Sequence, residues 1–227
     1  MRSWRVLRRE TLFSHRLFDL RRESLVAGPR VDSAATPPST GAADETTREA
    51  LTLDAPTWVN VIALLPDEGV LLVRQWRYGI GAETLEIPGG MVEVAETDDP
   101  RAAAGRELLE ETGYRAGRLT YLGEVEPNPA FITNRCLTFV AEDLVREGEP
   151  EGDGEEELVV EIAALDEIPR LILSGAIRHA LVIAAFYLFE HSRRSSALDT
   201  ELRRSSAPDT ELRRSSVLDK ELRRSSL

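Results

Sequence analysis

One short segment of this chain, residues 99–113, has unusually complete signals for where a helix begins and ends. Asp99 can cap the free backbone amides, and Pro100 suits the first helical position. Gly113 suits the left-handed position that follows a last helical turn. The sequence therefore predicts a helix over residues 100–112. Any fold for this chain must place the charged side chains of this helix favourably.

Three glutamates of this segment lie three and four residues apart, at Glu107, Glu110 and Glu111, so they project from one face of the predicted helix. Carboxylates this close repel one another unless a positive charge lies between them. Mg²⁺ and Mn²⁺ prefer oxygen ligands and few protein anchors, which leaves positions for water and phosphate. A solvated acidic helix face is the ordinary alternative, but the nearby Gly90, Glu96 and Arg106 favour a metal site.

The composition excludes several classes of protein. Of the 227 residues 42% are hydrophobic, and the longest apolar run, residues 180–189, is too short to span a bilayer. It predicts a buried helix instead. A net charge of −12 provides no basic footprint for nucleic acid, whereas small phosphorylated substrates need only local positive charge from metal ions. Cys136 is the only cysteine, and residues 1–25 do not resemble a secretory signal, so a cytoplasmic enzyme is expected.

The chain divides into four regions. Residues 1–27 predict a hairpin of two strands, and residues 28–50, rich in Pro, Ser, Thr and Ala, predict a flexible loop. Residues 51–194 alternate apolar runs with turn signals, as a folded domain does. Residues 195–227 repeat the motif RRSS every ten residues and predict a disordered or loosely helical tail. A regulatory kinase site in that tail is the alternative.

The order of elements in the middle region predicts an α/β (α+β) sandwich. Runs of β-branched and apolar residues indicate strands on both sides of the glutamate helix, and a second helix is predicted from about residue 174 to residue 191. The predicted strands cover residues 58–65, 70–75, 84–87, 121–125, 135–141 and 157–162.

Residues 90–114, GMVEVAETDDPRAAAGRELLEETGY, resemble the Nudix box, G-x5-E-x7-R-E-U-x-E-E-x-G-U, in which U is hydrophobic. Residues 106–114 match its second half throughout, and Gly90 and Glu96 match its first half. The gap between Glu96 and Arg106 is nine residues instead of seven, which we interpret as a two-residue insertion before the helix. Another register would use Asp98 but would replace the glycine by Val92. The resemblance covers roughly residues 54–188.

This resemblance implies a Nudix-type α/β/α sandwich with a mixed central sheet, and it assigns roles to the box residues. Glu107 and Glu111 would ligate Mg²⁺ or Mn²⁺, with Glu110 as a further ligand or base. Arg106 would orient a glutamate through a salt bridge, and the Gly89 carbonyl oxygen would be an extra ligand.

The flanking segments VRQWR and TLEIPGG resemble the branch that hydrolyses ADP-ribose and related nucleoside diphosphate sugars. The residues implied for substrate binding are Arg77 and Arg74 for phosphate, Glu86 before the glycines, and Asn134 and Arg135 in a loop. Trp76 and Tyr78 are candidates for stacking on adenine. A catalytic base is expected in the acidic stretch 147–157, where Glu155 and Glu156 are candidates and Glu156 is our choice. His179 is interpreted as structural.

The predicted activity is metal-dependent hydrolysis of the diphosphate bond of such a substrate, giving AMP and a sugar phosphate. One alternative keeps the metal helix but changes the substrate to a dinucleoside polyphosphate, NADH or a nucleoside triphosphate. Another is a binding module of the same fold without catalysis, which the three intact helix glutamates disfavour. Members of this branch pair through N-terminal strands, so a homodimer is also implied.

Overall fold

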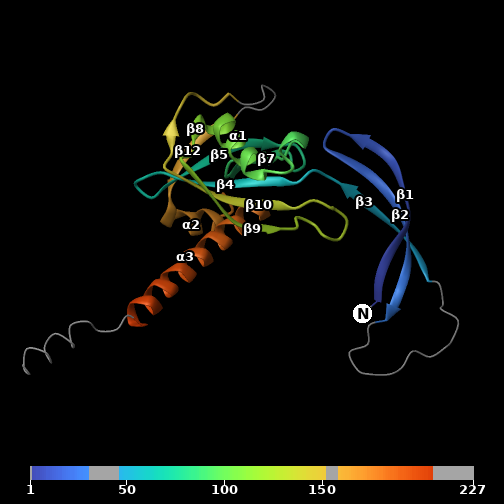
Figure 1. Ribbon diagram of the computed structural model, residues 1–227. Coiled ribbons are helices and arrows are strands. Elements are labelled where there is room, and N and C mark those ends of the chain that lie inside the picture. Colours follow the sequence, from blue (N-terminus) through green and yellow to red (C-terminus); the bar gives the residue numbers. More distant parts are fainter. Residues whose placement is uncertain (1, 31–45, 152–157, 207–227) are drawn as a thin grey trace, which may run out of the picture. The chain divides into compact units, whose positions relative to one another are not determined.

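The computed structural model describes residues 2–30, 46–151 and 158–206 (Figure 1). It has the mixed α/β architecture that the sequence predicts, with one large sheet, two smaller ones and few helices. The chain divides into two compact units, the first up to Leu188 and the second from Phe189 onward. All the described residues that the sequence predicts for the site belong to the first unit.

The N-terminal strands form a three-stranded antiparallel sheet, where the sequence predicted only a hairpin. Its strands are β1 (Arg2–His15), β2 (Phe18–Arg30) and β3 (Thr47–Asp54), in the order β1-β2-β3. The end of β2 and the start of β3 thus occupy parts of the stretch 28–50 that was predicted to be a flexible loop. Backbone pairing between β2 and β3 satisfies their amides and carbonyls whatever their side chains, so a composition poor in large apolar residues did not prevent a strand. Residues 31–45 lie outside the described part of the chain.

A seven-stranded mixed sheet forms the centre of the fold. Its main path is β12-β5-β4-β10-β9, with β6 paired to β5 and β7 paired to β4. Strands β4 and β10 run parallel, and the remaining pairs are antiparallel. Its strands are β4 (Trp58–Leu64), β5 (Gly69–Arg77), β6 (Ala82–Glu86), β7 (Gly89–Met91), β9 (Arg118–Val125), β10 (Cys136–Glu142) and β12 (Val159–Ala164). A separate two-stranded sheet pairs β8 (Tyr114–Arg115) with β11 (Val145–Arg146).

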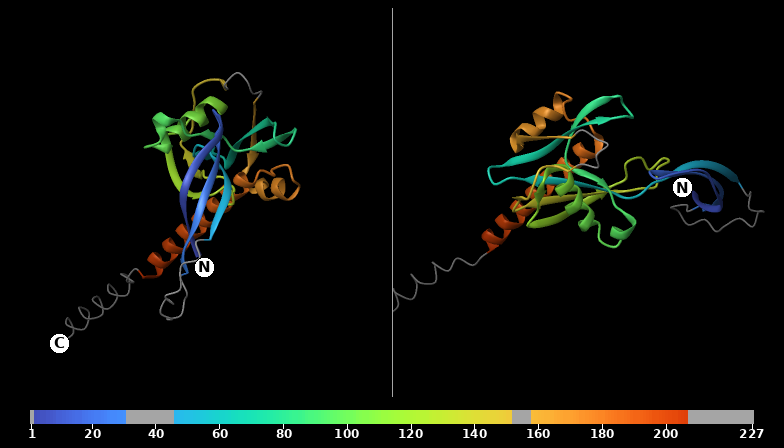
Figure 2. Two further views of the ribbon diagram at one scale, coloured as in Figure 1. Left: turned by 90° about the vertical axis from the view of Figure 1, so that its right-hand side faces the viewer. Right: turned by 90° about the horizontal axis from the view of Figure 1, so that it is seen from above.

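Helix α1 (Pro100–Thr112) packs on one face of the large sheet, as Figures 1 and 2 show. Its small residues Ala103 and Ala104, together with Leu108, are fully buried. They join the alternate positions Val59, Val61 and Ala63 of β4 in one apolar cluster. Because successive strand residues point to opposite faces, this alternation fixes which face of β4 the helix covers.

The other helices follow β12. They are η2 (Leu165–Glu167), α2 (Ile168–Leu173) and α3 (Ala180–Ser206), and α2 and the start of α3 lie on the face of the sheet opposite to α1 (Figure 2). The sequence predicted one helix from about residue 174. Gly175 instead adopts a left-handed φ of 75°, which ends α2, and α3 begins at Ala180. In the described part of the chain, no helix combines the length and apolar character that crossing a bilayer requires.

Helix α3 runs on to Ser206 and so includes the first of the ten-residue repeats. The sequence predicted a disordered or loosely helical tail from residue 195, so the backbone of residues 195–206 follows the helical option. Residues 207–227, which hold the remaining repeats, lie outside the described residues.

Helix α1 begins and ends where its boundary signals predicted. The Asp99 carboxylate accepts a hydrogen bond from the Arg101 amide at 3.2 Å, and Gly113 has a left-handed φ of 74°. The inserted residues fall within the short turn, residues 97–99, between η1 (Val94–Glu96) and the start of α1. The insertion therefore lengthens a connection and leaves the helix itself unchanged.

We expect substitution by alanine to have opposite effects on stability at two glycines of this segment. We expect Gly113→Ala to lower the free energy of unfolding by about 1–3 kcal/mol, because its left-handed φ disfavours a Cβ that would also meet the Gly148 carbonyl oxygen. Gly105→Ala, within α1 and 3.6 Å from the nearest Leu119 atom, should raise it by about 0.5–1 kcal/mol. Urea unfolding of both variants measures the difference, and equal effects would contradict the assignment of Gly113 as the helix cap.

Candidate functional site

Arg106 of α1 links the acidic residues around the helix. Its Nε and Nη2 donate to both carboxylate oxygens of Glu96, at 2.9 and 3.1 Å. Its Nη1 donates to Glu110 at 2.8 Å and lies 3.0 Å from a Glu107 oxygen. Nη2 also donates to the Met91 carbonyl oxygen of β7 at 3.0 Å. One guanidinium thus fixes three carboxylates and the adjacent strand.

This geometry supports the box register with Glu96, whose carboxylate Arg106 holds through two hydrogen bonds. The hydrogen bond with Glu96 is the main cause that raises the pKa of Arg106, and it lowers the pKa of Glu96 in turn. The side chain of Glu96 is also mostly shielded from solvent. Asp98, the acidic residue of the other register, is exposed.

Two glycines of β7 let the helix glutamates approach the sheet closely. A Cβ at Gly90 would lie 2.5 Å from the Glu107 carboxylate carbon, so only glycine leaves room for that side chain. The Gly89 amide donates to a Glu111 carboxylate oxygen at 2.9 Å. A Cβ at Gly89 would collide with the Val59 carbonyl oxygen. The double glycine therefore brings Glu107 and Glu111 against the same three-residue strand.

Burial raises the pKa of Glu107, and the neighbouring charges of Glu110 and Glu96 act in the same direction, while Arg106 opposes the rise. A carboxylate in this environment is short of positive charge. A cation bound next to it would therefore stabilise its ionised form.

The chemistry of these donors fits a hard divalent cation. The carboxylates of Glu107 and Glu111 place their oxygen atoms against the glycines of β7, and Glu110 lies on the same helix face. Within residues 2–30, 46–151 and 158–206, no three acidic, histidine or cysteine side chains are already arranged as a metal site. Mg²⁺ typically keeps several waters and takes only one or two carboxylates, so two protein anchors suffice for it.

A second arginine, Arg77, lies at the end of β5. Its Nε and Nη2 form two hydrogen bonds to the Glu86 carboxylate, at 2.9 and 2.8 Å. The Thr84 hydroxyl donates to the same carboxylate at 2.5 Å. Burial alone would raise the pKa of Glu86, but the bonds from Arg77 and Thr84 outweigh it and lower that pKa. The structure thus brings together two of the five residues predicted to bind substrate.

The other three predicted substrate residues have partners elsewhere. Arg74 forms an ion pair with Glu161 of β12 at 2.6 Å, and it lies three positions from Arg77, on the opposite face of β5. Arg135 pairs with Glu124 across β9 and β10. Asn134 is buried and donates to the Pro56 carbonyl oxygen at 3.1 Å.

The structure describes the two aromatic residues predicted to stack on adenine, but not the glutamates predicted as the catalytic base. Trp76 and Tyr78 are exposed on β5 and the turn that follows it. Glu155 and Glu156 lie outside the described residues. Residues 147–151 of the acidic stretch are described, and one of them contacts α1. The Glu151 amide donates a hydrogen bond to the Glu110 carbonyl oxygen at 2.9 Å.

Sequence reasoning missed the Met91 carbonyl and the Thr84 hydroxyl as parts of these arginine sites. Backbone carbonyls carry no residue signal, so nothing in the sequence marks Met91. Thr84 lies two positions before Glu86 on β6, hence on the same strand face, and that alternation could have indicated it.

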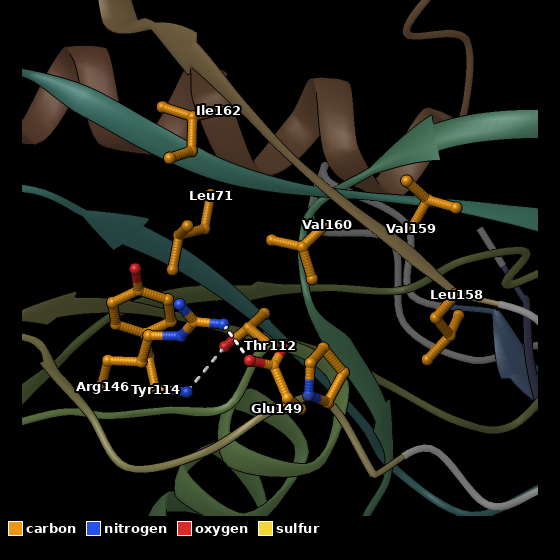
Figure 3. A pocket seen from close by; sticks show the side chains of 10 residues that line it. Leu71, Thr112, Tyr114, Arg146, Glu149, Leu158, Val159, Val160 and Ile162 are labelled. Carbon is orange, nitrogen blue, oxygen red and sulfur yellow. Dashed lines mark hydrogen bonds and ion pairs between the residues drawn. The ribbon is translucent and has the colours of Figure 1, made fainter.

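A pocket of about 420 Å³ lies at the end of α1, between β5, β12 and the residues after β11 (Figure 3). Leu71 and Val160 provide apolar walls, and Arg146 donates to Glu149 at 2.6 Å along another side. None of the predicted site residues that the structure describes lines it. Its one carboxylate is already paired, so we place the candidate active site at β7 and α1 instead.

A glutamate-bearing helix packed on the double glycine of a mixed sheet is the arrangement of a Nudix-type hydrolase. The family model described as NUDIX domain matches residues 56–186. The chain belongs to this family, and it is a hydrolase of a kind that generally depends on divalent metal ions.

Named relatives and a solved structure agree with this assignment. The chain is 37% identical to mouse (Mus musculus) ADP-sugar pyrophosphatase over 158 residues, which cover 63% of this chain and 68% of the relative. It is 33% identical to the ADP-ribose pyrophosphatase of Bacillus subtilis (strain 168) over 126 residues, or 55% and 67% of the two chains. A crystal structure of an ADP compounds hydrolase has a TM-score of 0.68 at 23% identity, covering 85% of this chain and 95% of that one, and shows the same fold.

We expect Gly90→Ala to weaken the binding of Mn²⁺ by at least about tenfold, because its Cβ would displace the Glu107 carboxylate from β7. Electron paramagnetic resonance of free Mn²⁺ in a titration measures this affinity without any substrate. Gly105→Ala, on the helix that carries Glu107 and with its Cβ in ordinary contact with Leu119 alone, is the matched control. Unchanged Mn²⁺ affinity in a folded Gly90→Ala variant would contradict the metal role of Glu107.

Proposed function

We propose that this hydrolase uses Mg²⁺, or Mn²⁺ in its place, to cleave the diphosphate bond of ADP-ribose or a related nucleoside diphosphate sugar. The products are AMP and a sugar phosphate. The observation that carries the proposal is the convergence of Glu107 and Glu111 on Gly89 and Gly90, with Arg106 holding the helix carboxylates. The names of the mouse and Bacillus relatives support the choice of substrate.

Each residue has a separate task in this proposal. Glu107, Glu111 and the Gly89 carbonyl oxygen hold the metal ion, and Glu110 is a further ligand or base. A divalent ion held there would neutralise the diphosphate charge and favour deprotonation of a water molecule. Arg106 keeps the carboxylates in place, since it contacts Glu96, Glu107 and Glu110 at once.

Substrate phosphate is held by Arg77, because a guanidinium binds phosphate oxygens through paired hydrogen bonds. Arg74, Asn134 and Arg135 stay candidates for contacts with the remainder of the substrate, and Trp76 and Tyr78 for the adenine. The exposure of both aromatic side chains is compatible with stacking on a base.

In the hydrolysis itself, the water oxygen forms a bond to one phosphorus, and the bond from that phosphorus to the bridging oxygen breaks. A glutamate accepts the proton that the water loses. Glu156 is our candidate for this base. In support of a base from this stretch, its described residue Glu151 donates its amide to the Glu110 carbonyl oxygen of α1.

Product analysis with a substrate panel tests the proposal. Purified protein with Mg²⁺ would be incubated with ADP-ribose, ADP-glucose, a diadenosine polyphosphate, NADH and dGTP. We expect fastest release of AMP from ADP-ribose or ADP-glucose. Preference for another member of the panel would change the substrate, and tight binding without any cleavage would contradict enzymatic activity.

We expect Glu111→Gln to lower kcat by at least about a thousandfold while the protein stays folded. The amide oxygen can still accept the Gly89 hydrogen bond, so the substitution removes the charge and little else. Steady-state kinetics and thermal unfolding of the same preparation separate the two effects. Activity near that of the unsubstituted protein would overturn the metal assignment.

We further propose that the protein is a homodimer that pairs through its N-terminal sheet and that it works in the cytoplasm. Exposed apolar side chains on β1, among them Trp4, Leu7 and Phe13, support a covered sheet face, and a lone buried cysteine suits a reducing compartment. Replacing Leu7 and Phe13 together by Ser should shift the mass measured by light scattering from two chains to one. A single-chain mass for the unsubstituted protein at micromolar concentration would exclude the dimer.

A further inference from the structure

The Glu86 carboxylate, which binds Arg77, is itself buried in the protein. Only 3% of the Glu86 side chain is exposed, whereas 38% of the Arg77 side chain is exposed. A buried carboxylate needs partners on its remaining lone pairs, because leaving them without hydrogen bonds is costly. Arg77 and Thr84 occupy both oxygens from the side of β5 and β6.

His179 approaches the same carboxylate from another element. It immediately precedes α3, and its Nδ1 lies 3.9 Å from the Glu86 oxygen Oε2. About a third of its side chain is exposed, but Nδ1 is enclosed and has no hydrogen-bond partner among the described residues. The neighbouring Arg178 also reaches β6, where it donates to the Glu83 carbonyl oxygen at 3.2 Å. Arg178 thus attaches the segment before α3 to β6, and His179 faces Glu86 from the same segment.

The helix itself does not require an imidazole at this position. The His179 carbonyl oxygen accepts hydrogen bonds from the amides of Val182 and Ile183 in the first turn of α3, both at 3.1 Å. That backbone role is open to any residue. The side chain instead faces Glu86, across a gap that needs to shorten by only about 1 Å to become a hydrogen bond.

The protonation of His179 suits a donor to Glu86. Burial lowers the pKa of His179, and Arg77 lowers it further, while Glu86 opposes this effect. This direction favours the neutral ring, and a neutral imidazole carries one N–H that it can place on Nδ1. A neutral donor adds no charge that would compete with Arg77 for the carboxylate.

We propose that Thr84, Glu86 and His179 are positioning residues that hold the Arg77 guanidinium in the orientation needed for a substrate phosphate. His179 acts on Arg77 only through Glu86. Glu86 takes two of the five N–H donors of Arg77 along one edge, which fixes the plane of the guanidinium. This inference rests on the phosphate-binding role of Arg77 in the proposed function.

A double-mutant cycle with ADP as the ligand tests the inference. Isothermal titration calorimetry with Mg²⁺ present would give Kd for the unsubstituted protein, Arg77→Ala, His179→Leu and the double variant. We expect Arg77→Ala to weaken binding by about ten- to a hundredfold and His179→Leu by about three- to tenfold. His179→Leu should have almost no further effect once Arg77 is alanine, because the two residues act in series.

Other variants separate positioning from general stability. His179→Asn should restore most of the affinity, since its amide nitrogen can take the place of Nδ1, and His191→Leu is the matched control at an exposed position. Thr84→Val removes only the hydroxyl that contacts Glu86, and it replaces His179→Leu in the cycle if that variant does not fold. Equal losses in both Arg77 backgrounds, or no loss from His179→Leu, would refute the positioning role.

The outcomes also distinguish this inference from the proposed function. If ADP binds with the expected coupling but ADP-ribose is not cleaved, the proposed function fails and the positioning role stands. If ADP does not bind the unsubstituted protein, Arg77 does not hold a diphosphate and the inference is wrong. Cleavage of ADP-ribose with additive effects of Arg77→Ala and His179→Leu leaves the function intact and removes His179 from the site.

Discussion

The candidate site depends on one charge compensation, between Arg106 and the carboxylates of Glu96, Glu107 and Glu110. Three acidic side chains in a half-buried setting repel one another, and without a shared cation the helix face could not lie against the sheet. Arg106 meets this need with a planar donor that reaches all three residues and the Met91 carbonyl oxygen. A lysine, with a single ammonium, could not reproduce those directions. The carboxylate face of α1 is therefore ordered by the protein's own charges.

That compensation works only because strand β7 has no side chains where the glutamates lie. Gly89 and Gly90 belong to the sheet through their pairing with β4, yet they also receive Glu111 and Glu107 from the helix. A residue with a Cβ at Gly90 would force Glu107 outward and disturb its contact with Arg106. The box glycine and the box arginine are thus two parts of one packing problem, separated by sixteen residues in the chain. This explains physically why the glycine must precede a helix of this kind.

The elements that could be predicted from the sequence are those that local chemistry determines. Helix α1 was predicted from its cap, its proline and its terminal glycine, and it has the predicted bounds. Strand β3 was missed because its support comes from pairing with β2, and the start of α3 was misplaced because a single glycine ends the preceding helix. The ion pair of Arg74 with Glu161 joins residues 87 positions apart, so no local pattern could have shown that this predicted phosphate ligand has a structural partner. The pair of Arg77 with Glu86, by contrast, spans one hairpin, and its residues were both named from the sequence.

The two arginines show how one kind of interaction serves different ends in the same molecule. Arg106 is largely buried and forms ion pairs with three carboxylates, so its positive charge is balanced within the protein. Arg77 binds the Glu86 carboxylate and stays partly exposed. That carboxylate also accepts a hydrogen bond from a hydroxyl of β6, and a histidine just before α3 faces it. In the proposed function, the first arrangement orders the carboxylates that would hold a metal ion, and the second presents a guanidinium to the substrate phosphate. Positive charge for an anionic substrate would then be supplied locally, although the chain as a whole is strongly acidic.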